Sequence, residues 1–264
     1  MCALQNKNLP DNITDYELVW SDEFNYEGLP DETKWSYDIG GHGWGNQELQ
    51  CYTADKNAYV SNGNLVIEAR HEACGDNNFS SARLVTKGKG DFLYGKIEVS
   101  AKVPEALGTW PAIWMLPTDW QNVSWPLCGE IDIMEHVGYK VGEILGTVHT
   151  GAYNHTIDTQ QGGHINIENV KGAFHKYSIE WLPNKINFYV DDQLYYSFNP
   201  FDTYEDVDAS KWPYNKPFHI ILNIAVGGTL GGKCGVDSIA FPQTMEVEYV
   251  RVYQSPTITK LGEE

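Results

Sequence analysis

Three acidic residues lie close together in the run Glu130–Glu135, whose other members are apolar. Side chains alternate along a β-strand, so Glu130 and Asp132 share one face while the two isoleucines between the acids take the other. Glu135 has the opposite parity, and in a regular strand it would bury an unpaired charge in the core. We therefore predict a β-bulge at Met134, which resets the alternation and brings all three acids to one face.

Two carboxylates on one open face are the groups that cleave glycosidic bonds, because one attacks the anomeric carbon and the other protonates the leaving oxygen. A retaining mechanism needs them about 5 to 5.5 Å apart. Four strand steps of about 3.3 Å put the Cα atoms of Glu130 and Glu135 roughly 13 Å apart. The long side chains must therefore lean together over a concave sheet. Asp132 would hydrogen-bond one glutamate and raise the pKa of the proton-holding group.

The same run has two simpler interpretations, a solvated acidic face of a strand and an oxygen-ligand metal site. A calcium site draws its acids from loops more often than from one flat strand. The surrounding sequence has to separate these alternatives.

Composition narrows the class of partner. The 264 residues carry a formal net charge of −18, which disfavours nucleic acids and anionic membrane surfaces and fits an uncharged substrate. Solubility or a salty medium would explain the charge equally well. Nine Trp and 16 Tyr exceed ordinary core needs, and some are expected to stack on sugar rings in a binding surface.

Cysteine usage and the ends of the chain bear on its location. The five Cys form no CxxC pair, which disfavours a zinc or redox motif and leaves disulfide pairing open. No apolar run is long enough to span a membrane, and the start shows no signal peptide. We expect a secreted, extracellular or cell-surface protein whose leader has been removed, with Cys2 as a candidate lipid-bearing residue.

Segments of period two, bounded by Gly, Pro, Asn and Asp, recur along the chain and predict an all-β, many-stranded antiparallel protein of two packed sheets. The acidic pair at 191–192 predicts a hairpin turn, and 200–217 reads as a long loop. We expect an N-terminal segment 1–15, a single catalytic domain 16–254 and a polar tail or linker 255–264. The expected strands are Glu17–Trp20, Asn64–Arg70, Tyr94–Val103, Ala112–Leu116, Glu130–His136, Ile144–Thr150, Lys176–Trp181, Lys185–Val190, Leu194–Phe198, Phe218–Val226 and Met245–Tyr253.

The chain resembles glycoside hydrolase family 16, and within it the bacterial laminarinases, which hydrolyse β-1,3-glucan. The resemblance covers nearly the whole chain. Besides Gly129–His136, it rests on Trp20–Phe24, Trp44–Gln50, Ser81–Leu84, Gly108–Met115, Gly146–Thr150, Leu222–Gly228 and Val250–Tyr253.

This resemblance implies a curved, concanavalin-like β-jelly roll with an open substrate cleft on its concave sheet. It implies Glu130 as nucleophile, Asp132 as its supporting acid and Glu135 as acid/base. Relatives of the lichenase type have one residue fewer between the last two acids. Met134 therefore favours the bulged, laminarinase type.

The resemblance also implies a set of substrate-binding residues. The aromatic members would form a platform under the sugar, the polar members would meet hydroxyl groups, and His149 would hydrogen-bond Asp132 or the acid/base. A core position remains the alternative for each ring, including that of His149. The set is Asn46, Arg83, Trp110, Trp114, Trp125, His149 and Gln243.

Many relatives hold a structural calcium away from the chemistry, using backbone oxygens and one late acidic side chain. The matching positions are Glu23, Gly63 and Glu248. Relatives often have Asp at the last position, and the longer Glu248 affects ligand distances, which are about 2.3 to 2.6 Å for calcium. Catalysis itself needs no cofactor. His136 departs from the aromatic residue expected after the last acid.

The leading hypothesis is a monomeric endo-hydrolase of internal β-1,3-glucosidic bonds in laminarin-type glucan, acting with retention through a covalent glycosyl-enzyme. The same acids would serve mixed-linkage glucan, a galactan such as agarose or porphyran, xyloglucan or transglycosylation. A non-catalytic glucan-binding module is the alternative of another class. Such a binder needs neither Glu130 nor Glu135, and both are present.

Overall fold

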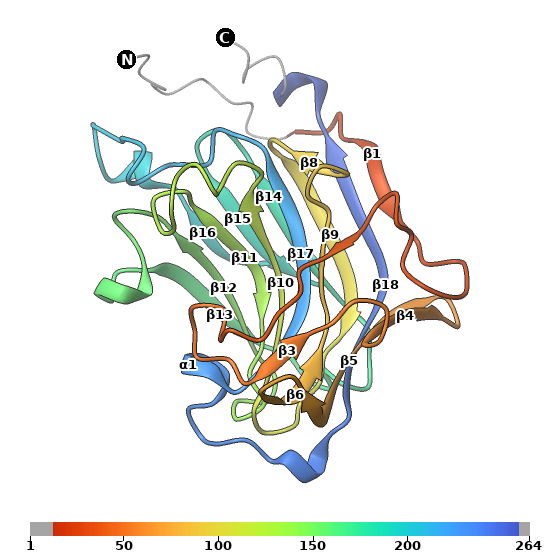
Figure 1. Ribbon diagram of the computed structural model, residues 1–264. Helices are drawn as coiled ribbons and strands as arrows, with labels where there is room; N and C mark the ends of the chain where they lie inside the picture. The colour runs from red at the N-terminus through yellow and green to blue at the C-terminus, as the bar shows by residue number, and fades with distance from the viewer. Residues whose placement is uncertain (1–12, 259–264) are drawn as a thin grey trace.

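Strands with one buried face build most of the protein, as the buried-every-second-residue pattern of β5 (Asn64–Cys74) illustrates. The computed structural model describes residues 13–258, and in this range the strands form two sheets that pack face to face (Figure 1). The sheet of ten strands has the order β16-β15-β14-β9-β18-β5-β6-β3, with β1 and β4 added to β18 and β5. The sheet of eight strands has the order β13-β12-β11-β10-β17-β7-β2, with β8 added to β17.

The strands of the first sheet, besides β5, are β1 (Glu17–Asp22), β3 (Gln50–Tyr52), β4 (Ala58–Ser61), β6 (Asn77–Ser81), β9 (Gly95–Lys102), β14 (His175–Trp181), β15 (Ile186–Val190), β16 (Gln193–Phe198) and β18 (Gln243–Gln254). Those of the second sheet are β2 (Ser36–Tyr37), β7 (Arg83–Val85), β8 (Asp91–Phe92), β10 (Thr109–Pro117), β11 (Glu130–Glu135), β12 (Glu143–His149), β13 (Gln161–Asn166) and β17 (Phe218–Val226). Short helical turns include α1 (Gly228–Gly231), η1 (His155–Ile157), η2 (Pro200–Asp202) and η3 (Ser238–Ala240), and residues 256–258 are helical as well.

The predicted all-β sandwich is confirmed. The one parallel pair among the named strands is β3 with β6; the other named pairs are antiparallel. The main apolar core lies between the sheets and contains side chains from both, such as Ile131 and Val148 from one and Ile97 and Val250 from the other. Burial of this apolar surface holds the two layers together.

The hairpin predicted at the acidic pair joins β15 to β16. Asp191 and Asp192 have φ values of 49° and 65°, the left-handed conformation that a tight hairpin turn requires at both central positions. The predicted long loop contains the turn η2, and its residues Trp212 and Tyr214 are buried in the core. These rings fix the loop beside β11 and β12.

The two ends of the described chain meet. Asp15 accepts hydrogen bonds from Ser255 and from Thr257 Oγ1, the latter at 2.7 Å, and Ile258 is buried in the core. These contacts connect residues on either side of the expected domain bounds 16 and 254. Cys2 lies outside the described residues.

A disulfide joins Cys51 in β3 to Cys74 at the end of β5. Cys128 is buried and free, and Cys234 is exposed and free. Within residues 13–258, no helix has the length and apolar character to cross a membrane.

Candidate active site

The acidic strand β11 lies in the middle of the eight-stranded sheet, between β10 and β12. Its residues Ile131, Ile133 and Met134 are at most 1% exposed and enter the core. Glu130, Asp132 and Glu135 instead line a cavity on the other face of the sheet. All three acids therefore share one face, as the sequence predicted.

A bulge produces this arrangement. Asp132 and Glu135 pair with Thr147 and Leu145 of β12, so three steps on β11 match two on its neighbour. On the β10 side, the register shifts between Asp132 and Met134. The predicted bulge is confirmed, although the residue left without an opposite partner on β10 is Ile133 rather than Met134. The extra residue turns Glu135 out of the core.

Glu135 is held by Trp110, which comes from the adjacent strand β10. The indole Nε1 of Trp110 donates a hydrogen bond of 2.9 Å to Oε1 of Glu135. Such a bond fixes the side chain and favours its ionised form, while burial of the carboxyl acts in the opposite direction and raises its pKa.

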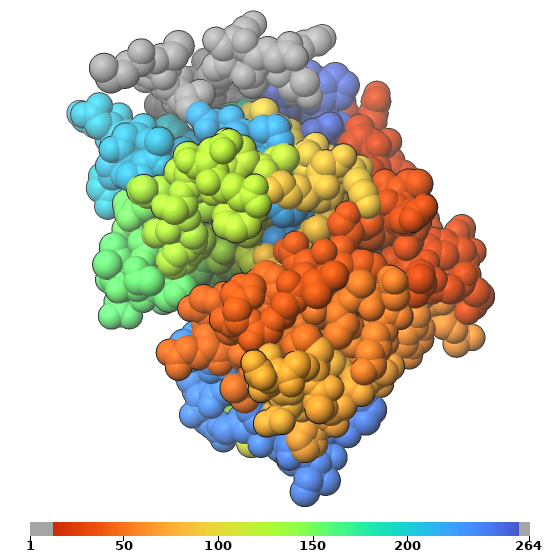
Figure 2. Space-filling model, viewed as in Figure 1, coloured from red at the N-terminus to blue at the C-terminus, as the bar shows by residue number. Residues whose placement is uncertain are grey.

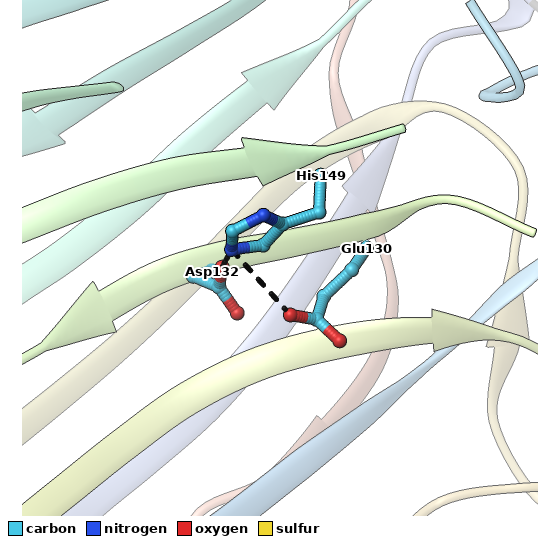
Figure 3. A group of neighbouring side chains, drawn as sticks. All are labelled: Glu130, Asp132 and His149. Carbon is cyan, nitrogen blue, oxygen red and sulfur yellow. Dashed lines mark ion pairs between the residues drawn. The ribbon is translucent and has the colours of Figure 1, made fainter. Parts of the chain in front are cut away.

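Glu130 and Asp132 face His149, which pairs with Glu130 across the strands β11 and β12. Figure 3 shows Nε2 of His149 directed at both acids, 3.8 Å from Oε1 of Glu130 and 3.4 Å from Oδ2 of Asp132. Burial lowers the pKa of His149 to about 3, and its ring is therefore neutral in the working range of an ordinary enzyme.

All three carboxyls have raised pKa values. Burial, followed by the charge of Glu135, raises the pKa of Glu130 to about 8, and burial with the charges of both glutamates raises the pKa of Asp132 well above its usual range. Arg83 and a hydrogen bond from Trp125 oppose the shift of Glu130. The raised pKa of Asp132 lessens the negative charge beside Glu130, and the positive charge of Arg83 favours the ionised form of Glu130.

The cavity around the acids has a volume of about 480 Å³. In Figure 2 the surface is hollowed here, between the yellow-green residues and the orange residues. Its apolar walls are Trp44, Trp110, Trp114, Trp120 and Trp125. Broad indole faces with carboxylates between them suit a sugar chain, whose C–H faces stack while its hydroxyls hydrogen-bond.

Arg83 forms the polar part of one wall. Its guanidinium carbon lies 4.7 Å from the ring centre of Trp44 and 4.6 Å from that of Trp114, and Nε lies 3.0 Å from Oδ2 of Asp38. The cation is thus fixed between two rings and retains N–H groups for a ligand.

A family model described as "Glycosyl hydrolases family 16" matches residues 45–251. The chain belongs to glycosyl hydrolase family 16. It is 53% identical over 258 residues to a beta-glucanase of Rhodothermus marinus, across 96% of this chain and 90% of that protein. The predicted resemblance to this family is confirmed.

Solved structures of family 16 enzymes share the whole architecture. The laminarinase from Rhodothermus marinus superposes with a TM-score of 0.88 at 54% identity, covering 91% of this chain and 98% of its own. SCLam, described as a non-specific endo-beta-1,3(4)-glucanase, gives a TM-score of 0.87 at 45% identity, covering 94% of each chain.

Most of the predicted binding residues meet in this family 16 cleft. His149 lies beside the acids. Five others line the cavity: Asn46, Arg83, Trp110, Trp114 and Trp125. Gln243 does not belong to this group. It begins β18 in the other sheet, where its amide donates to the carbonyl oxygen of Ala240, and it is absent from the cavity wall. The prediction that Gln243 faces the cleft was wrong, because strand order placed it in the opposite layer.

Glu48 is a cleft residue that the sequence interpretation missed. It is 9% exposed, and its carboxylate accepts hydrogen bonds from Gln50 (2.5 Å) and Tyr52 (3.2 Å). Tyr52 in turn accepts from Asn223, whose Oδ1 accepts from Nε1 of Trp114. This chain of bonds fixes the Trp114 wall. The signal available beforehand was an acid within the motif at 44–50.

Tyr214 is a second missed residue. Its hydroxyl lies 3.0 Å from the carbonyl oxygens of both Glu130 and His149. The long loop therefore ties the start of β11 to the end of β12, where the acid and the imidazole face each other.

The residues of the expected calcium site lie around one gap in the ten-stranded sheet. On one side, β18 pairs with β5 as far as Val247 and with β1 from Val250 onward. Glu248 lies between these two positions, Glu23 directly follows β1, and Gly63 directly precedes β5. The register thus brings the backbone of all three residues to the same place.

Two side chains at this gap already have protein partners. Glu23 forms two bonds with Arg251, of 2.9 and 2.7 Å, and Glu248 accepts a 2.9 Å bond from Ser100. Backbone oxygens and the second oxygen of Glu248 are the donors that would be left to hold a calcium ion there.

Proposed function

We propose that this family 16 chain is a retaining endo-hydrolase of internal β-1,3-glucosidic bonds in laminarin-type β-glucan. The observation that carries the proposal is the presence of Glu130 and Glu135 on one face of a bulged strand inside an indole-lined cleft. The names of the laminarinase and beta-glucanase relatives support the β-1,3-glucan backbone as substrate. The cavity is open to the surface between the yellow-green and orange residues of Figure 2, which suits binding in the middle of a chain.

In the first step, Glu135 gives its proton to the glycosidic oxygen as the carboxylate of Glu130 forms a bond to the anomeric carbon. The bond to the leaving sugar breaks, and that sugar departs with the proton. In the second step, Glu135 takes a proton from water, whose oxygen attacks the anomeric carbon as the bond to Glu130 breaks. The indole of Trp110 holds Glu135 in position for both transfers.

The experiment that tests the substrate compares reducing ends released from laminarin, lichenan, agarose and xyloglucan. The unmodified chain should be fastest on laminarin and release a ladder of oligosaccharides, and Glu130→Ala should keep its fold and lose turnover. Appreciable cleavage of laminarin by Glu130→Ala would remove Glu130 as the nucleophile.

Mixed-linkage β-1,3-1,4-glucan is a second candidate substrate, because SCLam is named a non-specific endo-beta-1,3(4)-glucanase. Rates on lichenan close to those on laminarin would favour it. A binding module without catalysis fits less well, because recognition alone gives no reason to bury three mutually repelling acids.

We also propose that Glu23, Gly63 and Glu248 hold one structural calcium ion, remote from the acids. The support is the gap between β5 and β1 described above. Adding calcium should raise the Tm, and a chelator should lower it without changing the pH profile of activity. Glu248→Gln should weaken this response, and an equal response in that variant would argue against the site.

A secreted or cell-surface location and a monomeric state complete the proposal. The Cys51–Cys74 disulfide supports an oxidising compartment. Fractionation of the source cells tests the location, and the mass in solution tests the monomer.

A further inference from the structure

Three potential metal ligands meet beside the cleft. Nε2 of His149 lies 3.4 Å from Oδ2 of Asp132 and 3.8 Å from Oε1 of Glu130 (Figure 3). All three ligand atoms lie within 4.8 Å of one another. Donors bound to zinc at about 2.0 to 2.1 Å in a tetrahedron are roughly 3.3 Å apart. The two distances from Nε2 are within about 0.5 Å of this spacing, and the two carboxylate oxygens, within 4.8 Å of each other, must approach to enclose such a cation.

The protein leaves part of this group unsatisfied. Asp132 is 4% exposed, and Oδ2, the oxygen that faces His149, has no hydrogen-bond partner among the described residues. A buried polar atom without a partner is costly, and a bound cation would relieve that cost. Glu130 and Asp132 line the cavity, so an ion can reach them from the solvent.

The donor set selects a class of metal. One imidazole with two carboxylates suits Zn²⁺ and its transition-metal neighbours, whereas Ca²⁺ and Mg²⁺ prefer more oxygen ligands. Three protein ligands would leave the fourth zinc position for water.

We propose that Glu130, Asp132 and His149 form a reversible site for one transition-metal cation, with Zn²⁺ as the probe, and that its occupation inhibits the enzyme. A cation at this point engages the carboxylate of Glu130 and occupies space beside the anomeric carbon of a bound sugar. Metal and glucan therefore exclude each other. The proposal that a metal binds rests on the geometry alone. The proposal that the metal inhibits the enzyme rests also on the proposed function.

The direct test is calorimetric titration of the full chain with Zn²⁺, in a buffer with excess Ca²⁺ so that the calcium positions are filled. The expected result is one site per chain. His149→Gln and Glu130→Gln should each weaken binding by at least about tenfold, because the first removes the imidazole nitrogen and the second replaces the anionic carboxylate by a neutral amide. Both substitutions keep a polar side chain of similar size, and circular dichroism checks that they fold.

His155→Gln is the matched control. Its ring centre lies 5.2 Å from that of His149, but it is not part of the ligand group. Its affinity for Zn²⁺ should stay within about twofold of the unmodified value. Equal affinity in His149→Gln, or an equal loss in His155→Gln, would overturn the site.

Cobalt(II) distinguishes this site from the free thiols of Cys128 and Cys234. Its visible absorption should appear without a thiolate-to-cobalt charge-transfer band and should vanish in His149→Gln. A thiolate band would place the metal elsewhere and refute the proposal.

The inhibition is measured separately. Zn²⁺ should raise the KM for laminarin and leave kcat unchanged, and a fall in kcat at constant KM would contradict competition. If the chain bound one Zn²⁺ through His149 but cleaved none of the four glucans, the proposed function would fail and the metal site would stand.

Discussion

The indole Nε1 of Trp110 lies 2.9 Å from Oε1 of Glu135 and donates a hydrogen bond to it. The bond favours the ionised carboxylate and so lowers the pKa of Glu135 against the effect of burial. Trp110 therefore affects the pKa of the group that donates the proton in the first chemical step.

Trp110→Phe should raise the pKa of Glu135, because it removes this bond. The acid must be protonated to act, and activity is lost as the pH rises through its pKa. The alkaline limb of the kcat/KM profile should therefore move up by about one pH unit, as a charged hydrogen bond is worth about 1.5 kcal/mol or more. Trp114→Phe, whose indole binds Asn223, should leave that limb in place. A downward shift, or the same shift in both variants, would contradict this role.

Glu130 makes stability depend on pH. Its pKa rises from the ordinary 4.5 to about 8 on folding, so the folded chain binds this proton more tightly than the unfolded chain. Stability from this source is present below the unfolded pKa and is lost as the pH rises through the folded pKa. Glu130→Gln cannot ionise. Between about pH 5 and pH 8, the free energy of unfolding of the unmodified chain should fall by on the order of 2 kcal/mol more than that of Glu130→Gln. Denaturant unfolding at each pH measures both values. Parallel curves for the two proteins would refute the prediction.

Arg83 should affect the pKa of the nucleophile Glu130 in addition to forming part of the cavity wall. Its charge lowers the pKa of Glu130, which must be ionised to attack. Arg83→Met should therefore move the acidic limb of kcat/KM to higher pH and reduce kcat/KM about tenfold through the lost stacked cation. Arg83→Lys keeps the charge but loses the planar group. The acidic limb of this variant should therefore lie close to that of the unmodified chain, while its kcat/KM stays reduced. An unmoved limb in Arg83→Met would exclude the electrostatic role.

Tyr214→Phe should destabilise the fold by about 1 kcal/mol, because the single hydroxyl proton that the carbonyl oxygens of Glu130 and His149 share is lost. The matched control is Tyr177→Phe. Both rings are fully buried, but the hydroxyl of Tyr177 has no hydrogen-bond partner among residues 13–258. Urea unfolding should show a loss for Tyr214→Phe alone, and equal losses would mean that the hydroxyl contributes nothing specific.

The sequence predicted the catalytic strand because its pattern contained a conflict. An acid of the wrong parity in an apolar run is tolerated only if the backbone changes its register, and the bulge near Met134 is that change. The Asp191–Asp192 turn could likewise be predicted from the sequence, because Asp tolerates a positive φ.

Other strands gave no such signal. β13 (Gln161–Asn166) contains two glycines and only one apolar residue, and it forms because β12 offers it a pairing edge. β3 and β6 are short and polar, and they pair in parallel beside the disulfide. Their formation depends on partners that a local pattern does not contain.

The binding residues show the same limit. Arg83 and the tryptophans could be chosen by type, but Gln243 could not be assigned to a layer without the strand order. The network at Glu48 closes through Asn223, which is 171 residues from Tyr52 in the chain. Only the folded sheet brings those two side chains together.

The most direct test of the central claim is the anomeric configuration of the first products, followed by proton NMR during cleavage of laminarin. Attack by Glu130 followed by attack of water inverts the anomeric carbon twice, so the new reducing ends should appear as the β-anomer and equilibrate later. Products that appear first as the α-anomer would mean a single displacement, and Glu130 would not be the nucleophile.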